Sequence, residues 1–240
     1  LGINLRYAQR GQLTLLHTDA TMRTFRESAE VGTHLGARTK MVDLKQIAEI
    51  VPSMPIDPGA RYPIQGGLWH EDGGTGRHDA MAWVYAMGAS RAGVEIHQKT
   101  EVTGVTIEDG KAVGVETTRG NVRCGQVVQA VAGMSSVVAK MAGFRLPIRT
   151  YPLQAMVTVP LKPFLDPLVS STALHTYVSQ TARGELVIGG GSDPYELYST
   201  RSTLDLNESL IAVTLELFPF LAEVKLMRQW AGMTDMTPDY

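Results

Sequence analysis

Two stretches of the sequence carry side chains whose types and spacing could do chemistry. The first is the run 73–83, which combines a glycine-rich turn, the imidazole of His78 and the carboxylate of Asp79 at the expected start of a helix. Backbone N–H groups at a helix N-terminus favour anions, and an imidazole nearby supplies a nucleophilic nitrogen. The run therefore predicts a cofactor-binding turn. An ordinary helix start, in which Asp79 favours the helix dipole, explains the same residues.

The second stretch is His175-Thr176-Tyr177. Residues two apart in a β-strand project from the same face, so we expect the imidazole and the phenol side by side. Such a pair can donate hydrogen bonds to a carboxylate or assist a proton transfer on the floor of a pocket. A structural pair of aromatic side chains on a sheet explains the pattern equally well.

A third candidate is the small-residue turn 130–135, which follows an apolar run and precedes a helix start at Ser135. This arrangement suits nucleotide binding at the carboxyl end of an open sheet, and tight packing of a strand on a helix is the alternative. The triple glycine 189–191 lacks the Lys-Ser/Thr of a phosphate loop, so we expect it to let a sheet bend or approach a ligand closely.

Composition and spacing exclude several classes of protein. The formal net charge of −2 argues against a nucleic-acid partner. The six histidines lack zinc-site spacing, and no Gly-x-Ser-x-Gly elbow of a hydrolase occurs, so we predict neither a metal site nor that hydrolase. No apolar run approaches the ~20 residues that span a bilayer, and no signal peptide is evident. The single cysteine, Cys124, fits a reducing compartment such as the cytoplasm.

Periodicity and turn signals predict the elements that position these residues. We expect helices over 19–38 with Asp19 as N-cap, 43–50 with Asp43 as N-cap, 79–93, 135–141 and 207–218. A hairpin is expected within 1–18 around Arg10-Gly11, and the Asp109-Gly110 pair predicts another between strands 101–107 and 112–117. The remaining strands are expected over 94–96, 121–122, 126–131 (apolar enough to be buried on both faces), 153–159, 174–179, 185–189 and 225–233.

This order of elements predicts an α/β plus α+β fold, in which part of a doubly wound domain with a β-meander is joined to a separate antiparallel sheet. The sequence opens with Leu1 and stops at Tyr240 in what reads as the middle of an element. We therefore expect it to be a fragment of a longer polypeptide.

Several stretches, taken in order, resemble the D-amino-acid-oxidase-like family of flavoproteins, and within it the β subunits of heterotetrameric sarcosine oxidases. The similarity covers nearly the whole chain. The matching stretches are residues 9–11, 61–63, 75–83, 101–104, 117–120, 141–144, 151–155, 177–180, 184–187, 216–219 and 228–239.

The resemblance implies a flavoprotein in which one domain binds FAD non-covalently and an antiparallel sheet shields the flavin and binds the amine. It assigns residues 76–147 and 232–240 to the FAD-binding domain, and 1–75 and 148–231 to the substrate domain. The family's dinucleotide loop is expected before residue 1, and its lysine-bearing flavin-side loop after residue 240. The chain alone is therefore expected to be inactive.

The implied reaction is the oxidation of sarcosine or a similar N-methyl amino acid, with the methyl group released as formaldehyde or passed to tetrahydrofolate. The implied partners are the other subunits of a sarcosine oxidase-like complex. An enzyme for another small amine, such as dimethylglycine or proline, is an alternative. A non-catalytic subunit that carries a flavin is another.

The resemblance also carries over residue by residue. His78 resembles the histidine that links FMN covalently, although relatives can have a second histidine at the position of Ala80. His175, with Tyr177 beside it, resembles the histidine that binds the substrate carboxylate. The residues implied to line the FAD are Val102, Ala130, Ala132, Gly133, Gly232, Met233 and Thr234.

Overall fold

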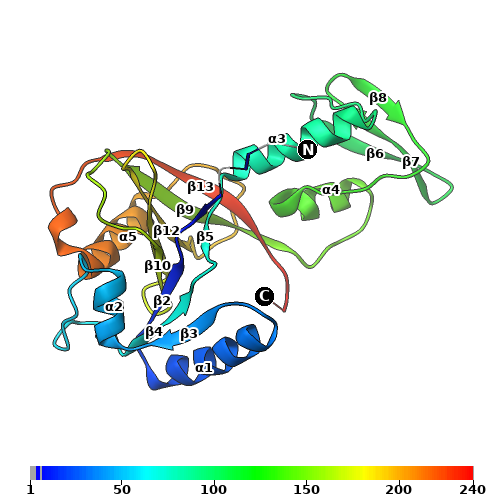
Figure 1. Ribbon diagram of the computed structural model, residues 1–240. Coiled ribbons are helices and arrows are strands. Elements are labelled where there is room, and N and C mark those ends of the chain that lie inside the picture. Colours follow the sequence, from blue (N-terminus) through cyan, green and yellow to red (C-terminus); the bar gives the residue numbers. More distant parts are fainter. Residues whose placement is uncertain (1–3, 6, 240) are drawn as a thin grey trace.

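The computed structural model describes residues 4–5 and 7–239, which form a larger lobe and a smaller lobe joined by long strands (Figure 1). The strands are β1 (Ala8–Gln9), β2 (Gln12–Leu16), β3 (Thr39–Val42), β4 (Gly66–His70), β5 (Gly74–Thr75), β6 (Val102–Glu108), β7 (Lys111–Thr117), β8 (Gly120–Arg123), β9 (Arg149–Thr158), β10 (Leu168–Ser171), β11 (Thr176–Gln180), β12 (Leu186–Ser192) and β13 (Leu226–Met236). The helices are α1 (Asp19–His34), α2 (Leu44–Ile50), α3 (His78–Arg91), α4 (Ser135–Met141) and α5 (Leu204–Leu217), with 3₁₀ turns η1 (Ala132–Met134) and η2 (Pro219–Leu221).

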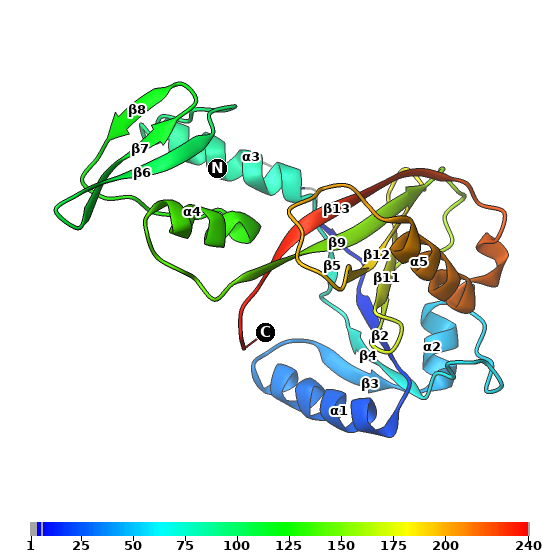
Figure 2. The same cartoon turned by 180° about the vertical axis from the view of Figure 1, so that it is seen from behind.

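An eight-stranded sheet forms the larger lobe, in the order β13-β9-β12-β11-β10-β2-β4-β3. The sheet is mixed because β10 and β2 run parallel, whereas its other neighbours are antiparallel. Strands β9 and β13 continue beyond the sheet as a paired ribbon toward the smaller lobe (Figure 2). We call this ribbon the neck.

The core of the larger lobe lies on one face of this sheet. Leu13, Val169, Val178, Ile188 and Met156 follow one another across five strands, and all are buried. Helices α2 and α5 pack on this side of the sheet. On the opposite face of the sheet, α1 covers β3 and β4. The rest of this face carries no helix among the described residues, and we call it the open face.

Capping explains where the first two helices begin. The Asp43 carboxylate accepts the Gln46 N–H at 2.8 Å, so the predicted N-cap of α2 is confirmed. In α1 the predicted cap at Asp19 is wrong, because Thr18 has the extended backbone and its hydroxyl accepts the Thr21 N–H at 3.2 Å. The helix ends at His34 instead of residue 38, two residues before Gly36 with its φ of +89°.

The first predicted hairpin is wrong. Strands β1 and β2 do not pair with each other, because Gly11 bends the chain at a φ of +82° and each strand pairs instead within the segment 66–75. The Trp69 ring fills the space beside Gly11 that a side chain would occupy. Residues 1–3 and 6 of that prediction lie outside the described residues, as does residue 240.

The smaller lobe contains the predicted meander β6–β8 and the helices α3 and α4. The β6–β7 hairpin is confirmed, with Asp109 and Gly110 at φ of +49° and +74°, as this two-residue turn requires. Helix α4 begins at the expected Ser135, but Met134 occupies the N-cap position and no side chain caps the helix, so the predicted serine cap is wrong.

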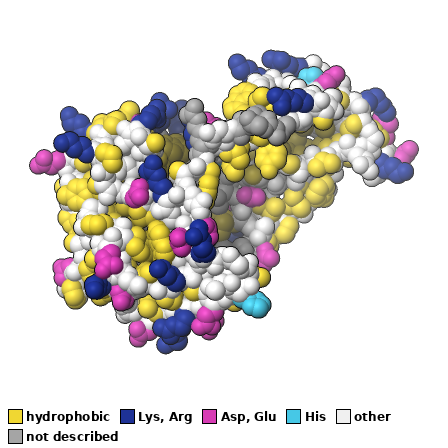
Figure 3. All heavy atoms as spheres, viewed as in Figure 1, with side chains coloured by type: hydrophobic (Ala, Val, Ile, Leu, Met, Phe, Trp, Pro, Cys, Tyr) yellow, Lys and Arg dark blue, Asp and Glu magenta, His cyan; other side chains and the backbone are white. Residues whose placement is uncertain are grey.

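Two predicted strands of this lobe, 94–96 and 126–131, are not formed, and Val128 is 88% exposed instead of buried. A strand needs a neighbour for its N–H and C=O groups, and no described residue supplies one to either segment. Helix α3 likewise has no buried residue, and its Trp83 and Tyr85 are exposed. Figure 3 shows hydrophobic side chains gathered on this lobe.

Candidate active site on the open face of the sheet

One row of side chains crosses the open face of the large sheet. Residues directly opposite each other on neighbouring strands point to the same face, so the strand register identifies the row. From β2 to β13 it is Thr14, Ser170, Tyr177, Gly189, Ala155 and Trp230. The Ser170 hydroxyl donates to Thr14 Oγ1 at 3.1 Å. The row is a floor of small and hydroxyl-bearing side chains with two aromatic rings.

Tyr177 is the polar group of this floor that is available to a ligand. Its side chain is half-buried, and its hydroxyl has no hydrogen-bond partner among the described residues. Its ring lies over Gly189, because a Cβ at position 189 would come within 2.8 Å of the ring atom Cε1. Burial raises the pKa of the phenol above its ordinary value, so the group stays protonated and able to donate.

His175 does not share a strand face with Tyr177, so that prediction is wrong. Strand β11 begins at Thr176, and His175 is the last residue of the turn from β10, with a left-handed φ of +46°. Its side chain is exposed. A left-handed residue breaks the alternation on which the prediction depended. The imidazole and the phenol still lie at the same end of β11, two residues apart.

The predicted flavin-side residues of β13 divide between its two faces. Strand register places Gly232 and Thr234 on the side of Trp230, where they continue the open face into the neck. Met233 points to the other side and meets Gly133 of η1, where a Cβ would lie 2.8 Å from the Met233 Cβ. The structure thus brings Gly133 and Met233 together.

Gly133 is buried, and its carbonyl accepts the Thr150 hydroxyl at 2.5 Å. Tight packing therefore explains this glycine. Ala130 and Ala132 are exposed, Ala132 at a left-handed φ of +42°. Val102 lies elsewhere in the smaller lobe, half-buried at the start of the edge strand β6 and opposite Thr117 on β7.

His78 is the first residue of α3, and its side chain is exposed. Arg77 and Asp79 on either side form an ion pair, with Arg77 Nε 3.0 Å from Asp79 Oδ1. The Arg77 guanidinium lowers the pKa of Asp79. The Arg77–Asp79 ion pair does not include the imidazole of His78, which is exposed at the start of the helix.

A hydrogen-bonded cluster around Asp72 fastens the turn that leads to His78. The Asp72 carboxylate accepts from Gln9 at 2.8 Å and from Arg38, and its backbone carbonyl accepts the Tyr7 hydroxyl at 2.8 Å. Arg38 lowers the pKa of Asp72, so the carboxylate stays charged. These contacts fix the path of the glycine-rich turn. The helix that follows the turn, α3, extends into the smaller lobe and has no buried residue.

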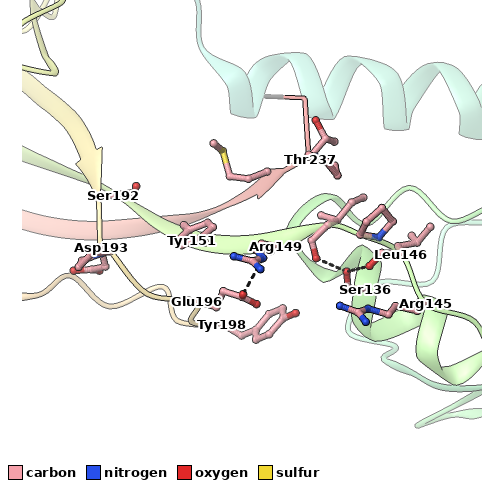
Figure 4. Close-up of a pocket in the computed structure, with 15 residues that line it drawn as sticks. Ser136, Arg145, Leu146, Arg149, Tyr151, Ser192, Asp193, Glu196, Tyr198 and Thr237 are labelled. Atoms are coloured by element: carbon pink, nitrogen blue, oxygen red, sulfur yellow. Dashed lines mark hydrogen bonds and ion pairs between the residues drawn. The ribbon is translucent and has the colours of Figure 1, made fainter.

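A cavity of about 680 Å³ lies elsewhere, beside the neck (Figure 4). The loop 192–198 faces the segment 145–151 across it, and an Arg149–Glu196 ion pair at 3.4 Å links the two. None of the sequence-predicted site residues lines this cavity. We place the candidate active site on the open face instead, because the free phenol of Tyr177 lies on that face and the exposed His175 lies in the turn at the same end of β11.

The sequence interpretation missed several residues. Ser170 and Thr14 gave no signal beyond strand alternation, and the role of Gly189 became visible only through its contact with Tyr177. The pairing register of β12 shifts at the triple glycine, an irregularity that is consistent with the expected bend. His17, buried next to the β10–β11 turn, was also missed. Within the described part of the chain no group of His, Cys, Asp and Glu could hold a metal ion, and no helix could cross a membrane.

Comparison with known proteins identifies the family of the chain. The model of the family described as FAD dependent oxidoreductase matches residues 1–240. The chain belongs to this family. Among its curated relatives are two proteins named sarcosine oxidase subunit beta. That of Rhodobacter capsulatus is 43% identical over 239 residues, which are 100% of this chain and 58% of the relative. That of Rhizobium meliloti is 42% identical over 236 residues, 98% of this chain and 56% of the relative.

Solved structures of other proteins share the fold. The L-proline dehydrogenase of P. horikoshii has a TM-score of 0.88 at 28% identity, covering 98% of this chain and 63% of that one. The glycine oxidase of Geobacillus kaustophilus has a TM-score of 0.85 at 18% identity, covering 99% and 62%. This FAD-dependent oxidoreductase chain thus spans somewhat more than half the length of the proteins it matches.

Proposed function

We propose that this chain is part of an FAD-dependent enzyme subunit that oxidises sarcosine or a similar N-methyl amino acid. The identities of 39–43% with three sarcosine oxidase β subunits, over nearly the whole chain, support this substrate class. These relatives are each named as one subunit of an oxidase, which supports the presence of partner subunits. We therefore propose that the chain works within a hetero-oligomeric complex.

The observation that carries the proposal is the free phenol of Tyr177 on the open face, with the exposed imidazole of His175 at the same end of β11. An amino-acid substrate brings one carboxylate and one amine. The protonated phenol donates a hydrogen bond to the carboxylate, and the His175 imidazole provides a second donor. Two donors orient the substrate above the floor of small and hydroxyl-bearing side chains.

Space for a flat ring system supports the assignment of FAD to this region. Open space lies over Gly232 of the neck, whose nearest neighbour to an added Cβ would be the Leu153 carbonyl at 4.0 Å, and Ala130 and Ala132, outside the neck, are small and exposed. When bound, FAD accepts the hydride equivalent that the amine gives up. We propose that Ala130, Ala132, Gly232 and Thr234 border it. We assign the Val102 backbone to its adenine end.

Further assignments rest on the similarity to the sarcosine oxidase β subunits. We propose that FAD is bound non-covalently, because no cysteine lies at 232–234, and that His78 carries a covalently linked FMN. Residues 76–147 and 232–240 are assigned to the FAD domain, with 1–75 and 148–231 in the substrate domain. Tetrahydrofolate as acceptor of the methyl carbon and a cytoplasmic location belong to the same proposal.

The test is anaerobic flavin reduction by the full-length protein assembled with its partner subunits. Sarcosine is expected to bleach the flavin absorbance faster than dimethylglycine or proline at equal concentration. The structural similarity to an L-proline dehydrogenase makes proline the competing substrate, and faster reduction by proline would replace our assignment. A flavin that none of the three amines bleaches would indicate a subunit that carries flavin without oxidising amines.

A further inference from the structure

A buried histidine lies directly behind the turn that carries His175. His17 follows β2, and only 8% of it is exposed. Both of its ring nitrogens have partners: Nδ1 lies 3.0 Å from the carbonyl oxygen of Tyr62, and Nε2 lies 2.8 Å from Oγ of Ser171. Neither the apolar alternation of β2 nor any motif explains an imidazole here.

The partners fix the direction of each hydrogen bond. A carbonyl oxygen can only accept, so Nδ1 carries the proton and donates to Tyr62. In the neutral ring Nε2 then accepts the Ser171 hydroxyl proton. The oxygen of Ser171 in turn accepts the backbone N–H of Leu174 at 3.2 Å. One continuous chain of hydrogen bonds therefore runs from the 51–65 loop through His17 to the β10–β11 turn.

This chain ends one residue before His175. The backbone of His175 is in the left-handed region, which costs free energy in a non-glycine residue and persists only when its surroundings hold it. On its other side the turn packs against β12, where the His175 carbonyl occupies the space that a side chain at Gly190 would need. The turn is thus held from the interior by His17 and from the neighbouring strand by Gly190.

We propose that His17 is a positioning residue for substrate binding, which acts by holding the β10–β11 turn so that His175 is presented at the end of the open face. This inference rests on the proposed function of His175. His17 touches no ligand itself, since both ring nitrogens are occupied and the ring is buried. Its loss therefore weakens binding of the amino-acid carboxylate and leaves the chemical step nearly unchanged.

Two substitutions separate hydrogen bonding from packing. His17→Phe keeps a ring of similar size and removes both hydrogen bonds. His17→Gln keeps one donor and one acceptor on a common carbon, so it can replace both. Ser171→Ala breaks the same chain at its next member and loses only one oxygen, so it replaces His17→Phe if that variant does not fold. His34→Gln, at an exposed position near the end of α1, is the matched control.

Each variant is made in the full-length, flavin-loaded assembly and measured in two ways. Hydrogen–deuterium exchange of a peptide covering 172–176 reports on the turn, and steady-state kinetics with sarcosine report on binding and chemistry. His17→Phe is expected to accelerate exchange of the Leu174 amide and to raise KM about tenfold, the loss of one hydrogen bond to a charged group, with kcat within about twofold. His17→Gln and His34→Gln are expected to resemble the wild type.

Unchanged exchange and KM in His17→Phe, or in Ser171→Ala, would overturn the inference. Equal impairment by Phe and Gln would also overturn it, because ring packing would then be the whole role of His17. If the wild-type assembly oxidises no amine, the proposed function fails. The exchange measurement still decides in that case whether His17 holds the turn.

Discussion

The Tyr177 ring lies directly against Gly189 of the neighbouring strand, so a side chain at position 189 and the phenol would compete for the same space. The pair fixes the height of the phenol above the sheet. A larger residue at 189 would lift the ring toward the substrate, whereas glycine keeps it close to the backbone. Gly189 is therefore as much a part of the candidate site as Tyr177.

Replacing Gly189 with alanine tests this relationship. We expect Gly189→Ala to destabilise the protein by about 1–3 kcal/mol, because the added methyl group overpacks a fixed contact, and to raise KM as the ring moves. Urea denaturation and kinetics measure the two effects. Gly125→Ala is the control, since a methyl group there meets nothing within 4 Å. Equal stability of the two variants would contradict the contact.

Replacing Tyr177 with phenylalanine separates stability from binding. The hydroxyl has no partner among the described residues, so Tyr177→Phe is expected to change the free energy of unfolding by less than about 0.5 kcal/mol. KM for sarcosine is expected to rise about tenfold, because a donor to the carboxylate is lost. A variant that loses stability but keeps its KM would show the opposite role, a structural hydroxyl.

The raised pKa of Tyr177 predicts a dependence of stability on alkaline pH. Above the ordinary value of 10.0 the unfolded chain releases the phenolic proton while the folded protein, with its raised pKa, retains it. The unfolded state then binds fewer protons, so the free energy of unfolding decreases as pH rises, until the folded phenol ionises as well. Urea midpoints of the wild type should fall relative to those of Tyr177→Phe in this range. Parallel curves would show that the phenol is not desolvated.

Replacing His78 with alanine tests the flavin attachment. Flavin that remains with the acid-precipitated, denatured full-length protein is expected to disappear in His78→Ala, while His97→Ala, another exposed histidine, retains it. The side chain of His78 is exposed, so stability is expected to change by less than about 0.5 kcal/mol. Retention of the flavin in His78→Ala would move the attachment point elsewhere.

Much of the fold could be predicted from local signals. The Asp43 cap, the Asp109-Gly110 turn and the apolar faces of the helices each act within a few residues, so the sequence contains their full cause. Segments 94–96 and 126–131 show the limit of such signals. Apolar composition indicates what a segment can become, but a strand also requires a partner, and the described residues do not provide one to either segment.

The same limit of local signals explains why only part of the candidate site could be predicted. Tyr177 lies on a regular strand, where alternation places its side chain correctly. His175 lies one residue before that strand with a positive φ, which a period-of-two argument cannot detect. Its support comes from His17, more than 150 positions away in the sequence, and only the folded sheet brings the two segments together.

The contact between η1 and the neck has a mechanical consequence. The turn Ala132–Met134 packs against β13 and β9, and Gly133 touches Met233 without any intervening side chain. A side chain at position 133 would meet Met233 and Thr150 of the neck at once, so neither neighbour alone could make room for it. Enlarging residue 133 is therefore expected to push η1 away from the neck. The separation of the two lobes at this contact is set by one missing methyl group.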